Sequence, residues 1–155
     1  MYHGIKNLVI TCLITTCALF LCAQLVMFIA VFFFGVEELS LPINVQKDIQ
    51  QNGFFVQIKI IFLSLFASLT EEFIFRYLLI AILRHIKVKL IIAIIISSAL
   101  FALCHRWEGP AGVANAFTSG IILCAMFVWR GSFGGIVAAH FLFDLLAFEM
   151  ALFAA

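Results

Sequence analysis

The sequence predicts an all-α protein, a multi-pass bundle of about five membrane helices with a polar site at mid-membrane depth. Of its 155 residues, 66% are hydrophobic and 11% are charged, whereas about a quarter of a soluble domain is charged. The apolar runs are long and lack the alternation of a strand, so helices satisfy their backbone in lipid. The net charge of +1 gives no basic field for nucleic acid. The expected partner is therefore the lipid bilayer.

Five apolar stretches are expected to form the helices, at residues 7–35, 54–83, 90–104, 113–129 and 133–154. About 20 residues cross a hydrocarbon core of roughly 30 Å. The first stretch is too long for a signal-peptide core and no cleavage site follows it, so it is expected to remain as a membrane anchor. The second has room to tilt, bend or divide near its acidic centre, and the third is short for a full crossing. Loops are expected over residues 36–53 and 105–112.

No repeat, low-complexity tract or linker divides the chain, so residues 1–155 are expected to form a single integral-membrane domain. The five cysteines all lie in apolar runs and show no C-x-x-C pair. We therefore expect buried thiols rather than disulfides.

The basic residues predict an orientation in the cell membrane. If the N-terminus is cytoplasmic, most of them fall on the cytoplasmic side, namely Lys6, Arg84, Lys87, Lys89 and Arg130. Cytoplasmic loops carry an excess of lysine and arginine. The sequence therefore predicts a cytoplasmic N-terminus and a C-terminus on the opposite side.

The second apolar stretch contains the segment SLTEEFIFR, which holds two adjacent carboxylates and an arginine. Charges inside a membrane cost about 2.5 to 3.5 kcal/mol each on insertion scales and so mark functional candidates. On a helix, Glu72 and Arg76 share a face and are expected to form an ion pair. Glu71 points about 100° away and is expected to be unpaired. Glu71 is therefore the candidate general base.

Two later helices add further polar residues. The third stretch ends in FALCH at His105, and the fifth contains HFLFD, which places His140 and Asp144 on one helical face. Counted from the cytoplasmic ends, Glu71, His105 and Asp144 lie about 18, 22 and 16 Å deep, and His140 about 10 Å. Helices that alternate in direction thus bring these side chains to similar depths. We expect them to share one polar pocket.

The motifs EExxxR, FxxxH and HxxxD, in this order on separate membrane helices, resemble the CAAX protease and bacteriocin-processing enzyme family, also called Abi, over about residues 60–146. The resemblance implies a glutamate-type intramembrane peptidase without a cofactor, acting on a membrane-associated peptide or protein. Eukaryotic and archaeal members of that family trim prenylated proteins, and bacterial members process peptides or confer immunity to bacteriocins. It also implies that Glu72 and Arg76 organise the first motif.

The resemblance further makes Glu71 the base that activates water together with His105, and it assigns the oxyanion to His140 and Asp144. The family has Asn or Asp at the last position. An ionised carboxylate cannot donate a hydrogen bond to an oxyanion. Asp144 must therefore be protonated, or must instead orient His140, which then donates.

The same residues also permit other chemistries. Two Glu, two His and an Asp are also a possible ligand set for a divalent metal, although no HExxH spacing supports it. Pure binding, as in an immunity or partner-binding membrane protein, is a further alternative. An ion-coupled carrier would usually show repeats, which this chain lacks. Cys104 and the segment 131–134 (GSFG) are better explained by packing and a tight turn than by a nucleophile.

Overall fold

The computed structural model describes residues 2–34 and 43–153, and every regular element in these ranges is a helix. The N-terminal part comprises α1 (Tyr2–Phe34), α2 (Ile43–Glu71), a π-helical segment (Glu72–Leu78) and α3 (Leu79–His85). The C-terminal part comprises α4 (Leu90–Cys104), a 3₁₀ turn (Arg106–Glu108), α5 (Gly109–Arg130) and α6 (Phe133–Phe153). The predicted all-α class is confirmed.

Four helical stretches are long and apolar enough to cross a membrane, and they are Gly4–Phe32, Gly53–His85, Arg106–Arg130 and Phe133–Met150. Leu90–Cys104 is a shorter apolar helix. All five predicted helices are therefore present, and the third has the bounds that the sequence predicts. Gly35 and Ala154, the outermost residues of two predicted stretches, lie outside the described residues.

Both helices that follow the predicted loops begin earlier than expected. Residues 36–53 were expected to form a loop, but α2 already begins at Ile43; residues 36–42 lie outside the described ranges. The segment 43–52 is polar but contains no Gly or Pro, so it keeps adequate helix propensity. Likewise α5 begins at Gly109, with Pro110 in its first turn, where proline suits a helix. An apolar stretch in the sequence indicates the part of a helix that suits lipid. The helix itself can continue beyond that stretch through polar residues.

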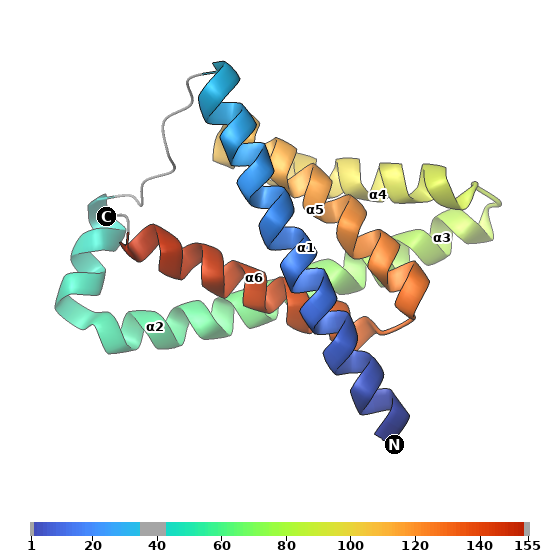
Figure 1. Ribbon diagram of the computed structural model, residues 1–155, viewed down its shortest axis with the longest axis horizontal. Coiled ribbons are helices and arrows are strands. Elements are labelled where there is room, and N and C mark those ends of the chain that lie inside the picture. The colour runs from blue at the N-terminus through green and yellow to red at the C-terminus, as the bar shows by residue number, and fades with distance from the viewer. Residues whose placement is uncertain (1, 35–42, 154–155) are drawn as a thin grey trace.

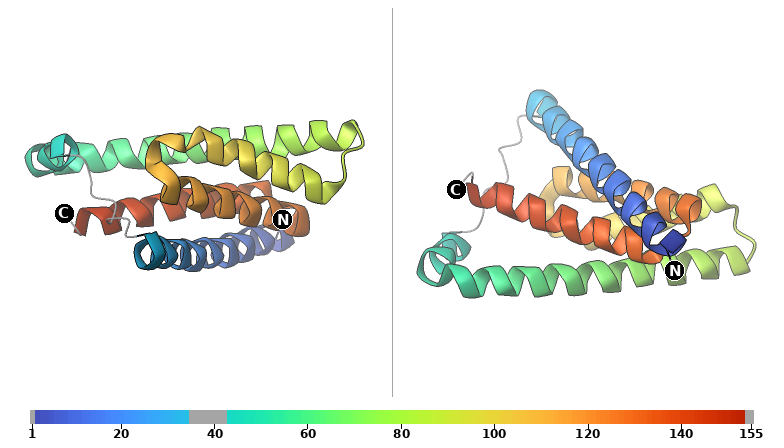
Figure 2. Two further views of the ribbon diagram at one scale, coloured as in Figure 1. Left: turned by 90° about the horizontal axis from the view of Figure 1, so that it is seen from above. Right: turned by 60° about the horizontal axis from the view of Figure 1, so that its bottom comes forward.

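The helices form a layered bundle around α5 and α6. Figure 1 shows α2 and α3 following each other along one side, with α4 returning antiparallel to α3. In the left view of Figure 2, α1 lies on the opposite side from α2 and α3, with α6 between them. The second stretch, which carries the two adjacent glutamates, therefore lies next to α6.

Small residues allow two close helix contacts. A Cβ on Gly120 of α5 would stand 3.0 Å from Ser98 Cα of α4, and one on Gly135 of α6 would stand 2.8 Å from Thr11 Cβ of α1. Close approach at small residues is typical of membrane helices. Gly131 has φ 60° at the end of α5, as a left-handed cap requires. The tight turn predicted at residues 131–134 is thus confirmed.

The start of α1 is tied to the end of α5. The Asn7 side-chain amide donates to the Arg130 carbonyl (3.1 Å), and Arg130 Nε donates to Thr11 Oγ1 (3.3 Å). In Figure 2 this end also carries the turn between α3 and α4. The five basic residues that the sequence analysis assigned to the cytoplasmic side thus belong to the elements that meet at this end, namely Lys6, Arg84, Lys87, Lys89 and Arg130. The side of the membrane that this end faces remains a prediction.

The cysteine prediction is partly wrong. All five cysteines are free, as expected, but Cys17 and Cys104 are exposed, while Cys12 and Cys124 are buried. An apolar helix in a bilayer presents apolar side chains to lipid as well as to the protein interior. An apolar neighbourhood in the sequence therefore does not determine which of these a thiol faces.

Candidate active site

The two adjacent glutamates lie where the second membrane stretch changes helix type. Glu71 ends α2 and Glu72 begins the π-helical segment, which continues without a break into α3. Such wide turns are rare and are frequent at functional sites. Ser97 on α4 donates a hydrogen bond to the Phe75 carbonyl inside the segment (2.6 Å) and so supports its altered backbone. The helix that was expected to bend or divide near its acidic centre instead widens there.

Glu72 connects an arginine and a histidine in the interior of the bundle. Its Oε1 lies 3.2 Å from an Arg76 guanidinium nitrogen and 2.8 Å from His140 Nδ1. The side chains of Glu72 and Arg76 are both 0% exposed. Since the carboxylate of this ion pair accepts hydrogen bonds, His140 Nδ1–H is the donor. The predicted Glu72–Arg76 pair is confirmed, and it also fixes one nitrogen of the His140 ring.

The other nitrogen of the same ring faces two further carboxylates. His140 Nε2 lies 3.7 Å from Glu71 Oε2 and 3.6 Å from Asp144 Oδ1. The expectation that Glu71 is unpaired is therefore wrong: its neighbour is a histidine that lies 69 positions later in the chain and that the geometry of one helix does not reveal. The carboxylate that hydrogen-bonds the ring is Glu72, rather than Asp144.

Phe101 of α4 packs against both the arginine and the two histidines. Its ring lies 4.2 Å below the Arg76 guanidinium carbon, an attractive cation–π arrangement. Ring centroids are 5.9 Å apart for Phe101 and His140 and 4.5 Å apart for Phe101 and His105. The phenylalanine of the FxxxH motif thus links α4 to the polar groups of the second stretch and of α6.

His105 joins the site through this aromatic contact. Its Nδ1 lies 2.9 Å from the Phe101 carbonyl, which can only accept, so Nδ1–H is the donor. In the neutral ring, Nε2 then carries a lone pair. His105 is also close enough to interact electrostatically with Asp144. Five of the six predicted residues are in direct contact, and the sixth lies beside them across the Phe101 ring.

Two side chains near the site were not singled out by the sequence. Ser68 is fully buried one turn before Glu72, with its Oγ 3.4 Å from Asp144 Oδ2. Glu108, in the turn after α4, interacts electrostatically with His105 and Glu71. The spacing of four residues before Glu72 could have indicated Ser68. No sequence signal indicates Glu108, because the 3₁₀ turn brings it back toward the site.

The part of the chain that the structure describes contains no group of three or more His, Cys, Asp or Glu that could hold a metal ion. Of the six site residues, His140 and Glu72 already use their facing atoms in a mutual hydrogen bond. Two apolar grooves flank α4, and none of the six site residues lines either of them. The residues that were expected to share one polar pocket thus lie together in a contact cluster within the bundle.

The segment that contains this cluster matches a known protein family. Residues 53–146, more than half of the chain, match the Rce1-like family, described as type II CAAX prenyl endopeptidase. The matched range begins with the second membrane stretch and ends just after Asp144. No curated protein and no solved structure matches the chain.

Proposed function

Because the chain belongs to the Rce1-like family of type II CAAX prenyl endopeptidases, we propose that it is a glutamate-type intramembrane peptidase that hydrolyses a peptide bond of a membrane-associated substrate. The observation that supports this most is the His140 ring between Glu72 on one nitrogen and Glu71 with Asp144 on the other. Titratable groups arranged around one ring inside membrane helices are typical of catalytic sites.

Glu71 is the base in this proposal. The Glu71 side chain is 30% exposed, whereas that of Glu72 is fully buried and paired with Arg76. Of the two neighbouring carboxylates, Glu71 is therefore the one that water and substrate reach. Glu71 takes a proton from water, and the water oxygen attacks the scissile carbonyl carbon. When the tetrahedral intermediate breaks down, the same proton passes to the leaving nitrogen.

His105 assists Glu71 by holding the water. Because its Nδ1–H is used by the Phe101 carbonyl, the neutral ring offers a lone pair at Nε2. That atom accepts a hydrogen bond from the attacking water and so orients it. His105 thereby acts as an acceptor beside the base.

The oxyanion is bound by His140 and Asp144. His140 Nδ1–H is already donated to Glu72, so a donor at Nε2 requires the doubly protonated ring. Nε2–H then points to the side where Glu71 and Asp144 lie, and donates to the developing negative charge. The Asp144 side chain is 30% exposed and can reach the same oxygen if it carries a proton.

The test is peptide cleavage by the full chain reconstituted in liposomes, with a fluorogenic farnesylated peptide and its unprenylated counterpart as probes. Glu71→Gln is expected to lower turnover by at least about 10³-fold, as for loss of the group that activates the nucleophile. Glu149→Gln removes a carboxylate of α6 outside the site and should leave turnover within about twofold. Near-normal cleavage by Glu71→Gln would rule out this mechanism. If the wild-type chain cleaves neither peptide, and a strain that carries Glu71→Gln shows the same phenotype as the wild-type strain while a deletion strain does not, the chain is instead a partner-binding membrane protein.

A further inference from the structure

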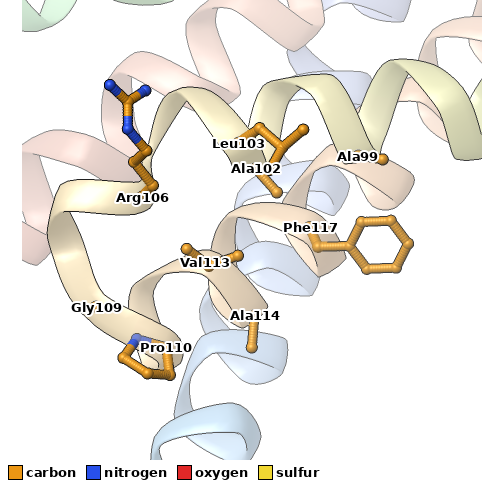
Figure 3. Close-up of a pocket in the computed structure, with 9 residues that line it drawn as sticks. All are labelled: Ala99, Ala102, Leu103, Arg106, Gly109, Pro110, Val113, Ala114 and Phe117. Carbon is orange, nitrogen blue, oxygen red and sulfur yellow. The ribbon is translucent and has the colours of Figure 1, made fainter.

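An open apolar groove runs between α4 and α5. It has a volume of about 740 Å³, and in Figure 3 Ala99 and Leu103 of α4 face Ala114 and Phe117 of α5 across it. Gly109 and Pro110 also line this groove, at the turn that joins the two helices. Its walls are almost entirely apolar, and Arg106 is the one charged side chain among its lining residues.

A second groove lies on the other face of α4. Its volume is about 420 Å³, and its walls come from the π-helical segment, α3 and α4, with Ile74, Leu78 and Leu100 among the lining residues. Leu103 and Arg106 line both grooves. The two apolar grooves thus share one charged lining residue, Arg106.

Arg106 lacks a protein partner for its charge. Its side chain is exposed, and among the described residues it makes no ion pair or hydrogen bond. The nearest acidic side chain in sequence, Glu108, lies over Gly112, where an added Cβ would meet its Oε2 at 2.9 Å. The guanidinium therefore remains available to an external anion.

The length of α4 places this arginine close to the hydrocarbon edge. α4 has 15 residues, which rise about 22 Å, and the hydrocarbon core is roughly 30 Å thick. Trp107, next in the chain, is 73% exposed, as suits an aromatic residue at the interface. A cation at this depth needs an anionic partner, and a phosphate accepts two parallel hydrogen bonds from arginine.

We propose that this end of α4 binds one anionic phospholipid, with the phosphate on Arg106 and one acyl chain in each groove. The two grooves that share one arginine match the two chains that share one headgroup. A soluble anion would gain nothing from the apolar walls, and none of the six residues of the candidate active site lines either groove. The site is thus separate from the peptidase proposal and does not depend on it.

Native mass spectrometry of the full chain, titrated in detergent micelles with phosphatidylglycerol or with diacylglycerol of the same acyl chains, which lacks the phosphate, tests the headgroup contact. The wild-type chain should retain one phosphatidylglycerol at about tenfold lower Kd than diacylglycerol, the scale of a hydrogen-bonded charge pair. Arg106→Gln should abolish this preference. Lys59→Gln, which removes an exposed charge of α2 outside both grooves, should keep it. The proposal is overturned if Arg106→Gln and Lys59→Gln lose the preference for phosphatidylglycerol equally, or if the wild-type chain shows no such preference.

The grooves are tested by filling one of them. Ala114→Phe occupies the first groove and should weaken binding of both lipids, whereas Ala125→Phe, at an exposed position of α5 outside it, should not. Inorganic phosphate should not displace the bound lipid; displacement by phosphate alone would assign Arg106 to a soluble anion. Competitive displacement by a farnesylated peptide at similar affinity would assign the grooves to a substrate tail and would also overturn the proposal.

Discussion

Glu72 Oε1 lies 2.8 Å from His140 Nδ1, and this contact joins the π-helical segment to α6. The same oxygen lies 3.2 Å from the Arg76 guanidinium. One buried carboxylate thus neutralises a buried cation and fixes the orientation of an imidazole. The neighbouring Glu71 is left as the more exposed carboxylate of the pair.

Glu72→Gln is expected to destabilise the folded chain, because it leaves the fully buried Arg76 without its ionic partner. Breaking a buried ion pair from one side typically costs about 3–5 kcal/mol. Thermal unfolding in detergent micelles, followed by far-UV circular dichroism, measures the change. Glu149→Gln provides the control for loss of a carboxylate outside the cluster, and equal melting temperatures for the two variants would contradict the structural role of Glu72.

Asp144→Asn is expected to retain activity and to extend it toward high pH. Ser68 has one hydroxyl proton, and it is donated to the Ser64 carbonyl at 2.6 Å. Ser68 Oγ also lies 3.4 Å from Asp144 Oδ2, and a hydroxyl oxygen can accept a hydrogen bond from a protonated carboxyl group as well as donate to an ionised one. An amide donates at any pH and would replace that proton.

The pH profile of the Asp144→Asn enzyme decides between the two roles of this residue. If Asp144 works as an ionised group that orients His140, a loss of about 10² to 10⁴ is expected, as for other orienting carboxylates of a catalytic histidine. A uniform loss of two or more decades across the pH range therefore refutes the donor role.

Peptidase activity is expected to survive exhaustive treatment with EDTA and 1,10-phenanthroline. Glu71 and His105 activate water without a Lewis acid in the proposed mechanism, and the sequence shows no local ligand spacing. Metal analysis of the purified chain should find no stoichiometric metal. Inhibition by the chelators that is reversed by Zn²⁺ would instead indicate a metalloprotease.

Single cysteines introduced at Asp48 and Lys87, in a background without the native cysteines, should be labelled from opposite sides of the membrane. The second stretch runs between these positions, and the basic end of the bundle is expected to be cytoplasmic. Impermeant maleimide applied to intact cells should thus label position 48 and leave position 87 unmodified. Labelling of both from one side would contradict the five-span topology.

Most of the helical architecture could be predicted from the sequence, because a long apolar segment in a bilayer must satisfy its backbone hydrogen bonds internally and therefore forms a helix. The ion pair of Glu72 and Arg76 was predictable as well, since both residues belong to one helix. The contact of Glu72 with His140 was not, because it depends on how two distant helices pack. Periodicity describes the face of one helix and carries no information on its neighbour.

The change of helix type at Glu72 was also beyond sequence reasoning. The hydrogen bond to the Phe75 carbonyl inside this segment comes from Ser97, which lies on another helix. The same limit applies to Glu108, whose approach to His105 is set by a turn of three residues. Local pattern therefore identified the residue types of the site, while tertiary packing determined their pairing.

The wide turn from Glu72 to Leu78 also makes this stretch sensitive to chain length. Its hydrogen bonds span five residues instead of four, so it accommodates one residue more than a regular helix would in the same place. Deleting one residue between Glu72 and Arg76 would therefore let regular helical hydrogen bonds form while α2 and α3 keep their relative rotation. Glu72 and Arg76 would then be three residues apart on a narrower helix, and Glu72 Oε1 would have to contact Arg76 and His140 from a different backbone position. A one-residue deletion thus tests the wide turn itself, whereas a substitution within this stretch tests one side-chain contact.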